Sequence, residues 1–308
     1  MRHGHSISFA AAALAALAAF APQAHAAAIA VTDDTGATVS LASPAQRVIS
    51  LAPHVTELLY AAGGGAKIVG AVTYSDYPPE AKQLPRVGDN KALDLERIVA
   101  LKPDLIVVWR HGNAQRQIER LRDLHVPLFF SEPHQLDDVA LTLAKLGQLL
   151  GTAPVADAAA GAYRQDIARL RARYAAQPPV SVFYQVWDQP LMTLNGTHMI
   201  SDVIALCGGR NVFAKLEPLV PTVSTEAVLA ANPEAIVTAA RGATAPDQPL
   251  PPLDKWRAWP GMTAVARNNL FAIDGDLIDR PAPRLAQGAA QLCEDLDVAR
   301  SRRAGRSP

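Results

Sequence analysis

Four side chains suited to holding a ligand each come directly after a short apolar run of the sequence. Pro53, Tyr74 and Trp109 follow such runs in the first half of the chain, and Trp187 follows one in the second half. The carboxyl ends of parallel strands meet at one sheet edge, where α/β proteins bind ligands. Packing in a core would explain any one of these aromatic residues alone. Because such residues recur at equivalent strand ends, the pattern favours a shared ligand-binding surface. Aromatic faces with few polar groups suit a large, flat, amphipathic ligand held by contact.

A charged stretch follows a further predicted strand, 270–273, in the second half of the chain. Carboxylates and a guanidinium there supply hydrogen bonds that orient a ligand on an apolar surface. We therefore add this stretch to the predicted binding surface. Its residues are Asp276, Leu277, Ile278, Asp279 and Arg280.

The sequence lacks the common motifs of enzymes. It contains no Gly-x-Ser-x-Gly elbow, phosphate-binding loop or dinucleotide fingerprint. The run Gly63–Gly65 ends a predicted helix instead of opening one, which makes it a poor phosphate cradle. None of the five histidines beyond residue 26 has the spacing of a metal ligand, so each is interpreted as a surface or packing residue. They are His54, His111, His125, His134 and His198. We predict no catalytic residue, no metal and no cofactor.

Two glutamates occupy matching places in an internal repeat. Segments 95–109 and 225–239 align without gaps at a constant offset of 130 and share Glu96 and Glu226. A carboxylate in the first turn of a helix complements the helix dipole, which contributes under ~1 kcal/mol and explains each glutamate singly. It does not explain why both copies keep the acid. Two acids related by pseudo-two-fold symmetry suit docking on a two-fold partner that carries arginines.

The elements that position these residues alternate between strand and helix, which predicts a parallel α/β fold. A second pair of segments, 56–64 and 201–209, supports the repeat, because both read as helices that end in glycines. A β-hairpin is predicted at 30–41. Segment 156–176 has apolar residues at helical spacing and predicts one helix of about 30 Å. The predicted fold class is therefore α/β, with two similar Rossmann-like lobes joined by a single long helix that limits hinge motion.

The charge balance and the first residues bear on partners and location. The 308 residues include 29 Lys+Arg and 29 Asp+Glu, which argues against nucleic-acid binding. The basic cluster 300–306 is interpreted as a solvated, frayed tail.

An apolar run, 7–21, leads to Ala24-His25-Ala26, the pattern of a cleaved signal peptide, and the run is short for a membrane span of about 20 residues. Cleavage removes Arg2 and no acid, which leaves 28 basic and 29 acidic residues in an exported chain.

The chain has two cysteines, Cys207 and Cys293. In an oxidising compartment they form a disulfide most simply, and two buried free thiols are the alternative. The disulfide would close a loop of 86 positions, worth roughly 4 kcal/mol in the chain-entropy model.

Several segments together resemble a known family. They are SDYPP at 75–79, LERIVALKPDLIVVW at 95–109, HGNAQRQ at 111–117, LCGGRNVF at 206–213 and QLC at 291–293. They resemble the periplasmic cobalamin-binding proteins of Btu-type ABC importers, from about Arg47 to about Leu296. That family is part of the class III substrate-binding proteins for corrinoids, haem and ferric siderophores, in which one helix joins two lobes.

The resemblance implies a periplasmic protein, monomeric when free, that holds cobalamin or a related corrinoid between its lobes. It implies delivery to an ABC permease dimer and its ATPase subunits at the inner membrane. Tyr74 and the stretch 276–280 match the residues that contact the corrinoid, and Pro53 and Trp109 match further pocket residues.

The same resemblance assigns roles to two pairs of residues outside the pocket. Glu96 and Glu226 match glutamates that dock on permease arginines. Cys207 and Cys293 match the disulfide of the family.

The sequence departs from the family at aromatic positions. The family has tryptophans where this chain has Asn90 and Val220, and a phenylalanine whose place lies beside Trp187. These losses leave cobalamin favoured and leave the choice among cobalamin, cobinamide and related corrinoids open. Haem or a ferric siderophore on the same fold is the first alternative; an exported enzyme and a purely structural exported protein are the others.

The expected organisation follows from these segments. It comprises a signal peptide at 1–26, an N-terminal lobe at 27–150, a connecting helix at 151–178, a C-terminal lobe at 179–298 and a disordered tail at 299–308.

Overall fold

The computed structural model describes Met1 and residues 28–240 and 251–304. Apart from Met1, the predicted signal peptide lies outside the described residues. Within the described ranges, no helix has both the length and the apolar character needed to cross a membrane.

The first lobe is built on a four-stranded parallel sheet in the order β4-β3-β5-β6. Its strands are short apolar runs that are buried because helices cover both faces of the sheet. The strands are β3 (Val48–Ser50), β4 (Ile68–Ala71), β5 (Leu105–Trp109) and β6 (Leu128–Ser131). The helices are α1 (Pro53–Ala61), α2 (Leu95–Ala100), α3 (Gln115–Arg122) and α4 (Leu136–Leu150), with 3-10 turns at Gly65–Lys67 and Pro79–Gln83. The predicted hairpin is confirmed as the antiparallel pair β1 (Ile29–Thr32) and β2 (Thr38–Leu41).

The second lobe repeats this plan. Its parallel sheet has the order β8-β7-β9-β10, which matches β4-β3-β5-β6 strand for strand and confirms the predicted duplication. The strands are β7 (Val180–Gln185), β8 (Gly209–Asn211), β9 (Ala235–Ala240) and β10 (Leu270–Asp274). The helices are α6 (Met199–Leu206), α7 (Thr225–Ala231), α8 (Pro251–Asp254), α9 (Thr263–Ala266), α10 (Gly275–Ile278) and α11 (Leu285–Ser301), with 3-10 turns at Lys255–Ala258 and Arg302–Ala304.

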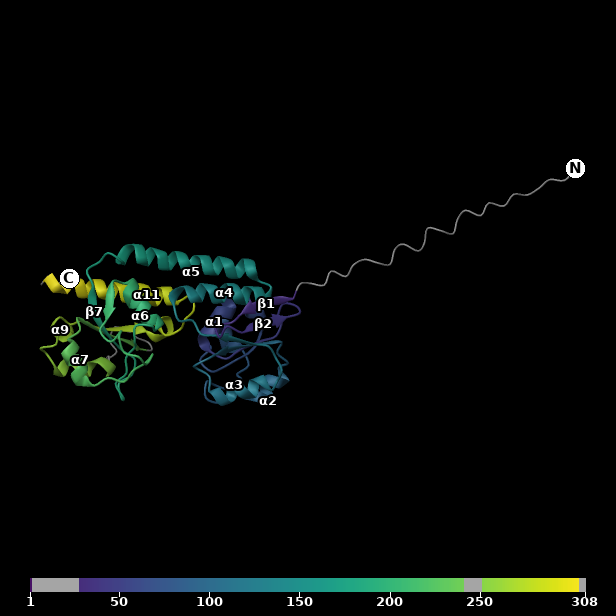
Figure 1. Ribbon diagram of the computed structural model, residues 1–308, viewed down its shortest axis with the longest axis horizontal. Coiled ribbons are helices and arrows are strands. Elements are labelled where there is room, and N and C mark those ends of the chain that lie inside the picture. Colours follow the sequence, from purple (N-terminus) through teal and green to yellow (C-terminus); the bar gives the residue numbers. More distant parts are fainter. Residues whose placement is uncertain (2–27, 241–250, 305–308) are drawn as a thin grey trace.

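Helix α5 (Ala153–Tyr174) joins the lobes and lies along α4 and α11 on one side of the molecule (Figure 1). Its 22 residues correspond to about 33 Å at 1.5 Å per residue. One apolar cluster continues from β3 through α4 and α5 into β7 and α11, so the lobes share a core on this side. Separate clusters fill the opposite faces of the two sheets. Because the shared core and the stiff helix both cross between the lobes, large bending there would expose buried apolar surface.

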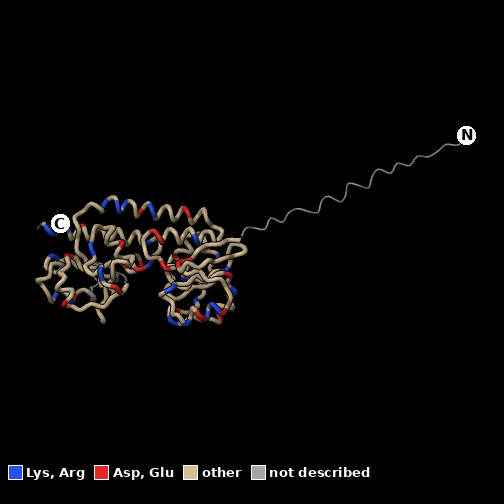
Figure 2. Tube along the Cα trace, in the orientation of Figure 1, with Lys and Arg blue, Asp and Glu red and all other residues tan. Residues whose placement is uncertain are grey.

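The predicted disordered tail, 299–308, is wrong for residues 299–304. Helix α11 continues to Ser301, and a 3-10 turn follows it. Arg300 donates from Nε to the carbonyl of Pro178 at 2.8 Å, and Arg303 donates from Nε and Nη2 to the two carboxylate oxygens of Glu234, each at 2.7 Å. These arginines find protein acceptors instead of water, which keeps the end of the helix in place. Elsewhere acidic and basic residues are interspersed over both lobes (Figure 2).

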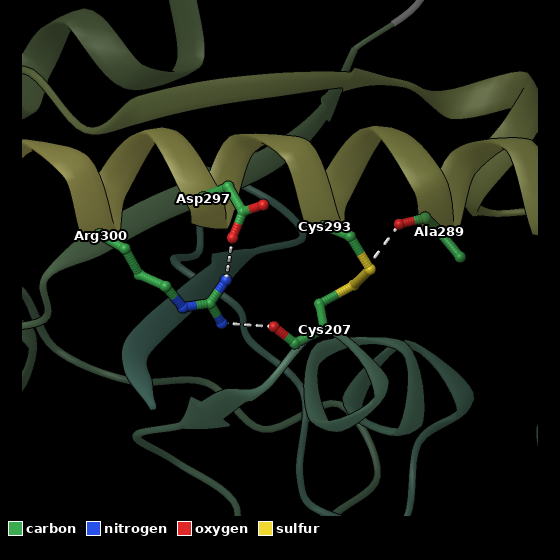
Figure 3. The surroundings of a disulfide bond; sticks show 5 residues. All are labelled: Cys207, Ala289, Cys293, Asp297 and Arg300. Atoms are coloured by element: carbon green, nitrogen blue, oxygen red, sulfur yellow. Dashed lines mark hydrogen bonds and ion pairs between the residues drawn. A yellow bond between two sulfur atoms is a disulfide. The ribbon is translucent and has the colours of Figure 1, made fainter. Parts of the chain in front are cut away.

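The two cysteines form a disulfide between α11 and the end of α6 (Figure 3). This bond joins Cys207 and Cys293, as the family resemblance implies. It therefore connects two helices that pack beside the second sheet.

Candidate functional site

A cleft between the lobes contains two adjoining cavities. The larger has a volume of about 390 Å³ and the smaller about 220 Å³. Trp109 from the first lobe and Asp279 from the second line both cavities, so the two spaces share a wall. The carboxyl ends of strands from both sheets therefore face one binding space.

The first lobe brings its three predicted residues together. Pro53, Tyr74 and Trp109 all line the smaller cavity. Pro53 and Tyr74 follow β3 and β4, and Trp109 is the last residue of β5. These strands are neighbours in the sheet, so their carboxyl ends share one edge. The Tyr74 backbone has a φ of 64°, in the left-handed region, and its side chain is 61 % exposed. The ring thus stands at the rim of the cleft and not in a core.

The second lobe contributes most of its predicted residues to the same space. Trp187, Ile278 and Asp279 line the larger cavity. Asp276 and Arg280 line a small side pocket of about 160 Å³, which also includes Asp279. Leu277 lines none of these spaces.

Trp109 is held by contacts that fix its ring. Asn113 accepts a hydrogen bond from the Trp109 backbone N–H at 2.9 Å and donates one to the Leu51 carbonyl at 3.0 Å, which ties the ends of β5 and β3 together. The His54 ring meets the indole edge-on, with centroids 5.3 Å apart. A Cβ on Gly112 would lie 1.7 Å from the indole, so the ring packs directly on the glycine backbone. Glycine is therefore required at 112 for this placement of the aromatic wall.

Arg280 lies where the lobes meet, with its side chain 9 % exposed. Its Nη1 donates to Glu57 at 2.9 Å and to Asp76 at 2.8 Å, both in the first lobe. Its Nη2 lies 2.8 Å from a carboxylate oxygen of Asp276. The predicted ligand residue Arg280 thus lines the cleft while it neutralises three carboxylates. Sequence reasoning missed this, because Glu57 is 223 positions away from Arg280.

Arg284 completes this inter-lobe ion cluster. It donates to Glu57 from Nε at 2.9 Å and from Nη2 at 2.6 Å, and its guanidinium lies 3.8 Å from the centre of the Tyr77 ring. Burial raises the pKa of Asp76, but the hydrogen bond and charge of Arg280 outweigh that effect and hold the pKa below its usual value. Removing one partner of such a pair would leave an uncompensated charge at the junction of the lobes.

Asp279 has a different environment on the cleft wall. Water reaches its side chain through the cleft, and the Tyr184 hydroxyl lies 3.4 Å from one oxygen. Desolvation by the surrounding protein raises the pKa of Asp279 to about 6, against the opposing effects of the Tyr184 hydrogen bond and Arg280. This carboxyl can therefore accept or, when protonated, donate a hydrogen bond to a ligand.

Three histidines that the sequence analysis assigned to surface or packing roles also line the cleft. His54 lines the smaller cavity, and His134 and His198 line the larger one. Burial, with a smaller effect of Arg280, lowers the pKa of His54 to about 3. The packing role of His54 holds in part, since its ring supports Trp109. The position of His54 next to Pro53, after a predicted strand, is the sequence signal that could have assigned this histidine to the cleft.

The positions at which the chain lacks the aromatic residues of the family also face the cleft. Asn90 lines the smaller cavity and Val220 the larger one. Among the described residues that line the two cavities, Arg280 is the one lysine or arginine, and Glu132 and Asp279 are carboxylates. The described walls are therefore aromatic, apolar and acidic.

Glu96 and Glu226 lie outside the cleft, in the first turns of α2 and α7. Asp94 and Ser224 cap these helices by accepting hydrogen bonds from the backbone N–H groups of Arg97 and Ala227. Figure 1 shows α2 and α7 on the side of the molecule opposite α5, one on each lobe.

The comparisons with known proteins agree with this architecture. A family model described as periplasmic binding protein matches residues 48–277. This chain belongs to the periplasmic binding protein family. The vitamin B12-binding protein of Vibrio cholerae serotype O1 (strain ATCC 39541) is 39 % identical over 257 residues, which cover 83 % of this chain and 91 % of that protein.

Two solved structures are similar to this periplasmic binding protein in both fold and sequence. The crystal structure of the periplasmic vitamin B12 binding protein BtuF of Vibrio cholerae has a TM-score of 0.76 and 40 % identity, over 83 % of this chain and 98 % of that one. A periplasmic heme binding protein from Pseudomonas aeruginosa has a TM-score of 0.70 and 28 % identity, over 81 % of this chain and 91 % of that one. The predicted fold class, two parallel α/β lobes joined by one helix, is confirmed.

Proposed function

We propose that this periplasmic binding protein captures cobalamin, or a closely related corrinoid, in the cleft between its lobes. It then delivers the ligand from the periplasm to an ABC permease dimer with its ATPase subunits. The relatives that share 39 % and 40 % identity with this chain are named for vitamin B12 binding. The protein binds and transfers its ligand without converting it.

The observation that carries the choice of ligand is the charge of the cleft. The arginine among its described lining residues is already paired with Glu57, Asp76 and Asp276, and two further carboxylates line the cavities. Haem carries propionate groups, and burying a carboxylate without a free cation is costly. Corrinoids carry neutral carboxamides around the ring, which need hydrogen bonds but no counter-charge. This argues for a corrinoid over haem.

The roles of the site residues follow from their positions. Trp109 and Trp187 line the cleft from opposite lobes, and Tyr74 adds a ring at the rim, which suits contact with a flat macrocycle. Pro53 and Ile278 supply apolar wall. Asp276 and Asp279 offer acceptors for amide N–H groups, and Arg280 donates to the ligand only in addition to its ion pairs.

Calorimetry with purified protein tests the proposal. The wild type should bind cyanocobalamin and cobinamide with heat release and bind haem far more weakly. Tyr74→Ala should weaken cyanocobalamin binding about three- to tenfold, since an aromatic contact contributes about 0.5–1.5 kcal/mol. Val99→Ala, at an exposed position of α2, is the control. Haem binding tighter than that of both corrinoids would overturn the proposal.

A further inference from the structure

His198 has one ring nitrogen committed to the fold. It is the residue before α6, and its Nδ1 accepts the backbone N–H of Ile200 at 3.2 Å. A nitrogen that accepts a hydrogen bond carries a lone pair, so the proton of the neutral ring is on Nε2. The helix cap therefore fixes the tautomer of this histidine.

The other ring nitrogen is available to a ligand. His198 is partly buried in the wall of the larger cavity. Among the described residues, no hydrogen-bond partner is found for its Nε2. The Nε2–H group is thus a donor without an acceptor in the described part of the chain, on a residue that lines the binding space.

The donor carries no charge. Burial, with a smaller contribution from His134, lowers the pKa of His198 to about 4. Protonation would also place a hydrogen on Nδ1 and break the cap of α6. At neutral pH the ring therefore offers a hydrogen bond and no counter-charge.

The other polar groups of the cavity decide which ligand atom can accept this bond. Glu132 and Asp279 line the same cavity, and its described lining residues include no lysine or arginine. A ligand carboxylate placed here would meet acidic neighbours, whereas an uncharged carbonyl would not. We propose that His198 is a specificity residue whose Nε2–H recognises a peripheral carboxamide oxygen of the ligand. This inference rests on the proposed function and names the ligand group that the cleft recognises, a peripheral carboxamide.

Two substitutions separate the two nitrogens. Asparagine places its Oδ1 near the position of Nδ1 and is a good helix cap, but it has no atom at the position of Nε2. Glutamine reaches the position of Nε2 with an amide N–H but loses the cap. His198→Asn should weaken cyanocobalamin binding about three- to tenfold, the effect of one hydrogen bond, and keep the unfolding midpoint. His198→Gln should keep the affinity within about twofold and lower the midpoint.

His125→Asn is the matched control, because His125 is exposed in the first lobe at a φ of 55°, which asparagine tolerates. A corrinoid with its peripheral carboxamides hydrolysed to carboxylates should bind the wild type more weakly than cyanocobalamin does. The inference is overturned if His198→Asn binds like the wild type, if His198→Gln loses as much affinity as His198→Asn, or if the hydrolysed corrinoid binds equally well. If the wild type binds no corrinoid at all, the proposed function fails instead.

Discussion

The helix after the first strand of each parallel sheet ends in the same way in both lobes, but different contacts hold that end in place. Helices α1 and α6 are both followed by a glycine in the left-handed region, Gly63 with a φ of 80° and Gly208 with a φ of 69°. In the first lobe the carbonyl of Ala62 accepts a hydrogen bond from the Thr152 hydroxyl at 2.6 Å. Besides local backbone hydrogen bonds, this side-chain hydrogen bond and apolar packing thus hold the duplicated corner there.

The equivalent corner of the second lobe has stronger restraints. The carbonyl of Cys207 accepts a hydrogen bond from Nη2 of Arg300 at 2.5 Å, and the Cys207 sulfur is bonded to Cys293 of α11 (Figure 3). Helix α11 begins directly after Arg284, which holds Glu57 of the other lobe. The covalent restraint therefore secures the helix that follows the inter-lobe ion cluster. The two lobes therefore share a fold, but the second has an added disulfide and arginine contact at the helix that adjoins the inter-lobe ion cluster.

The two lobes also differ on the cleft side. Trp109 ends β5, and Ala239 stands at the equivalent place of β9, 130 positions later. Both line the larger cavity. The first lobe thus supplies a broad ring where the second leaves space, and the second lobe places its own indole, Trp187, after another strand. A flat ligand can fill such an unequal space without symmetry of its own.

The largest expected effect comes from breaking the symmetry that the lobes retain. Glu96→Arg together with Glu226→Arg should abolish transport in cells and leave corrinoid affinity unchanged, because both acids lie on the face away from α5 and outside the cleft. Each single reversal should reduce transport less than the double one. Uptake of labelled cobalamin by cells, together with calorimetry, measures the two effects.

Asp157→Arg is the control for this reversal, since Asp157 is an exposed acid on α5, the helix on the side of the molecule opposite α2 and α7. Transport that persists in the double variant would remove the docking role from both glutamates. Loss of corrinoid affinity would instead mean that the substitutions disturb the cleft.

The next effect tests the stronger restraint of the second lobe. Replacing both cysteines, Cys207→Ala with Cys293→Ala, should lower the free energy of unfolding by roughly 4 kcal/mol, because the bond closes a loop of 86 residues in the unfolded chain. Denaturant unfolding of this variant and of the wild type measures the change. An unaltered midpoint would show that packing of α6 on α11 suffices without the bond.

Local signals predict the elements well and the inter-lobe contacts poorly. The repeat at offset 130 predicts α2, β5, α7 and β9, because caps, proline stops and apolar runs lie within a few residues of one another. Strand ends also predict that Pro53, Tyr74 and Trp109 share a cavity. These inferences need only the period of a strand and the common edge of a parallel sheet.

Other features depend on residues that are distant in sequence. The sequence does not show that Arg280 pairs with Glu57 across the lobes. It also does not show that Arg303 at the basic end of the chain pairs with Glu234. The sequence also does not mark His198, because the proposed role of this residue depends on which ring nitrogen accepts the Ile200 backbone N–H. Pairing of charged side chains across such separations leaves no periodic signal in the sequence.

A smaller effect, dependent on pH, should distinguish α11 from its counterpart α4. Each helix buries a polar atom without a described partner, the Thr142 hydroxyl in α4 and one Asp295 oxygen in α11. Burial, with the charge of Glu294, raises the pKa of Asp295 to about 7. Because this folded-state pKa lies above the unfolded one, the penalty is absent at low pH and grows as the pH rises from about 4 to 7.

Asp295→Asn should therefore stabilise the protein by about 1–2 kcal/mol at pH 8, and the gain should vanish below about pH 4. Unfolding at a series of pH values measures this. Asp157→Asn, at an exposed position of α5, should show no such trend. A gain of equal size at pH 4 and pH 8 would mean that the ionisation of Asp295 is not the cause.

The smallest effect concerns the hydrogen bond from the Thr152 hydroxyl to the Ala62 carbonyl in the first lobe. Thr152→Val replaces the hydroxyl by a methyl group of similar shape and leaves the Ala62 carbonyl without its donor. The free energy of unfolding should fall by about 1 kcal/mol, the usual contribution of one hydrogen bond. Thr152→Ser keeps the hydroxyl and should restore most of the loss. If valine and serine unfold alike, apolar packing of α1 against α4 and α5 already secures this corner, and the two lobes then differ more than the comparison of their helix ends implies.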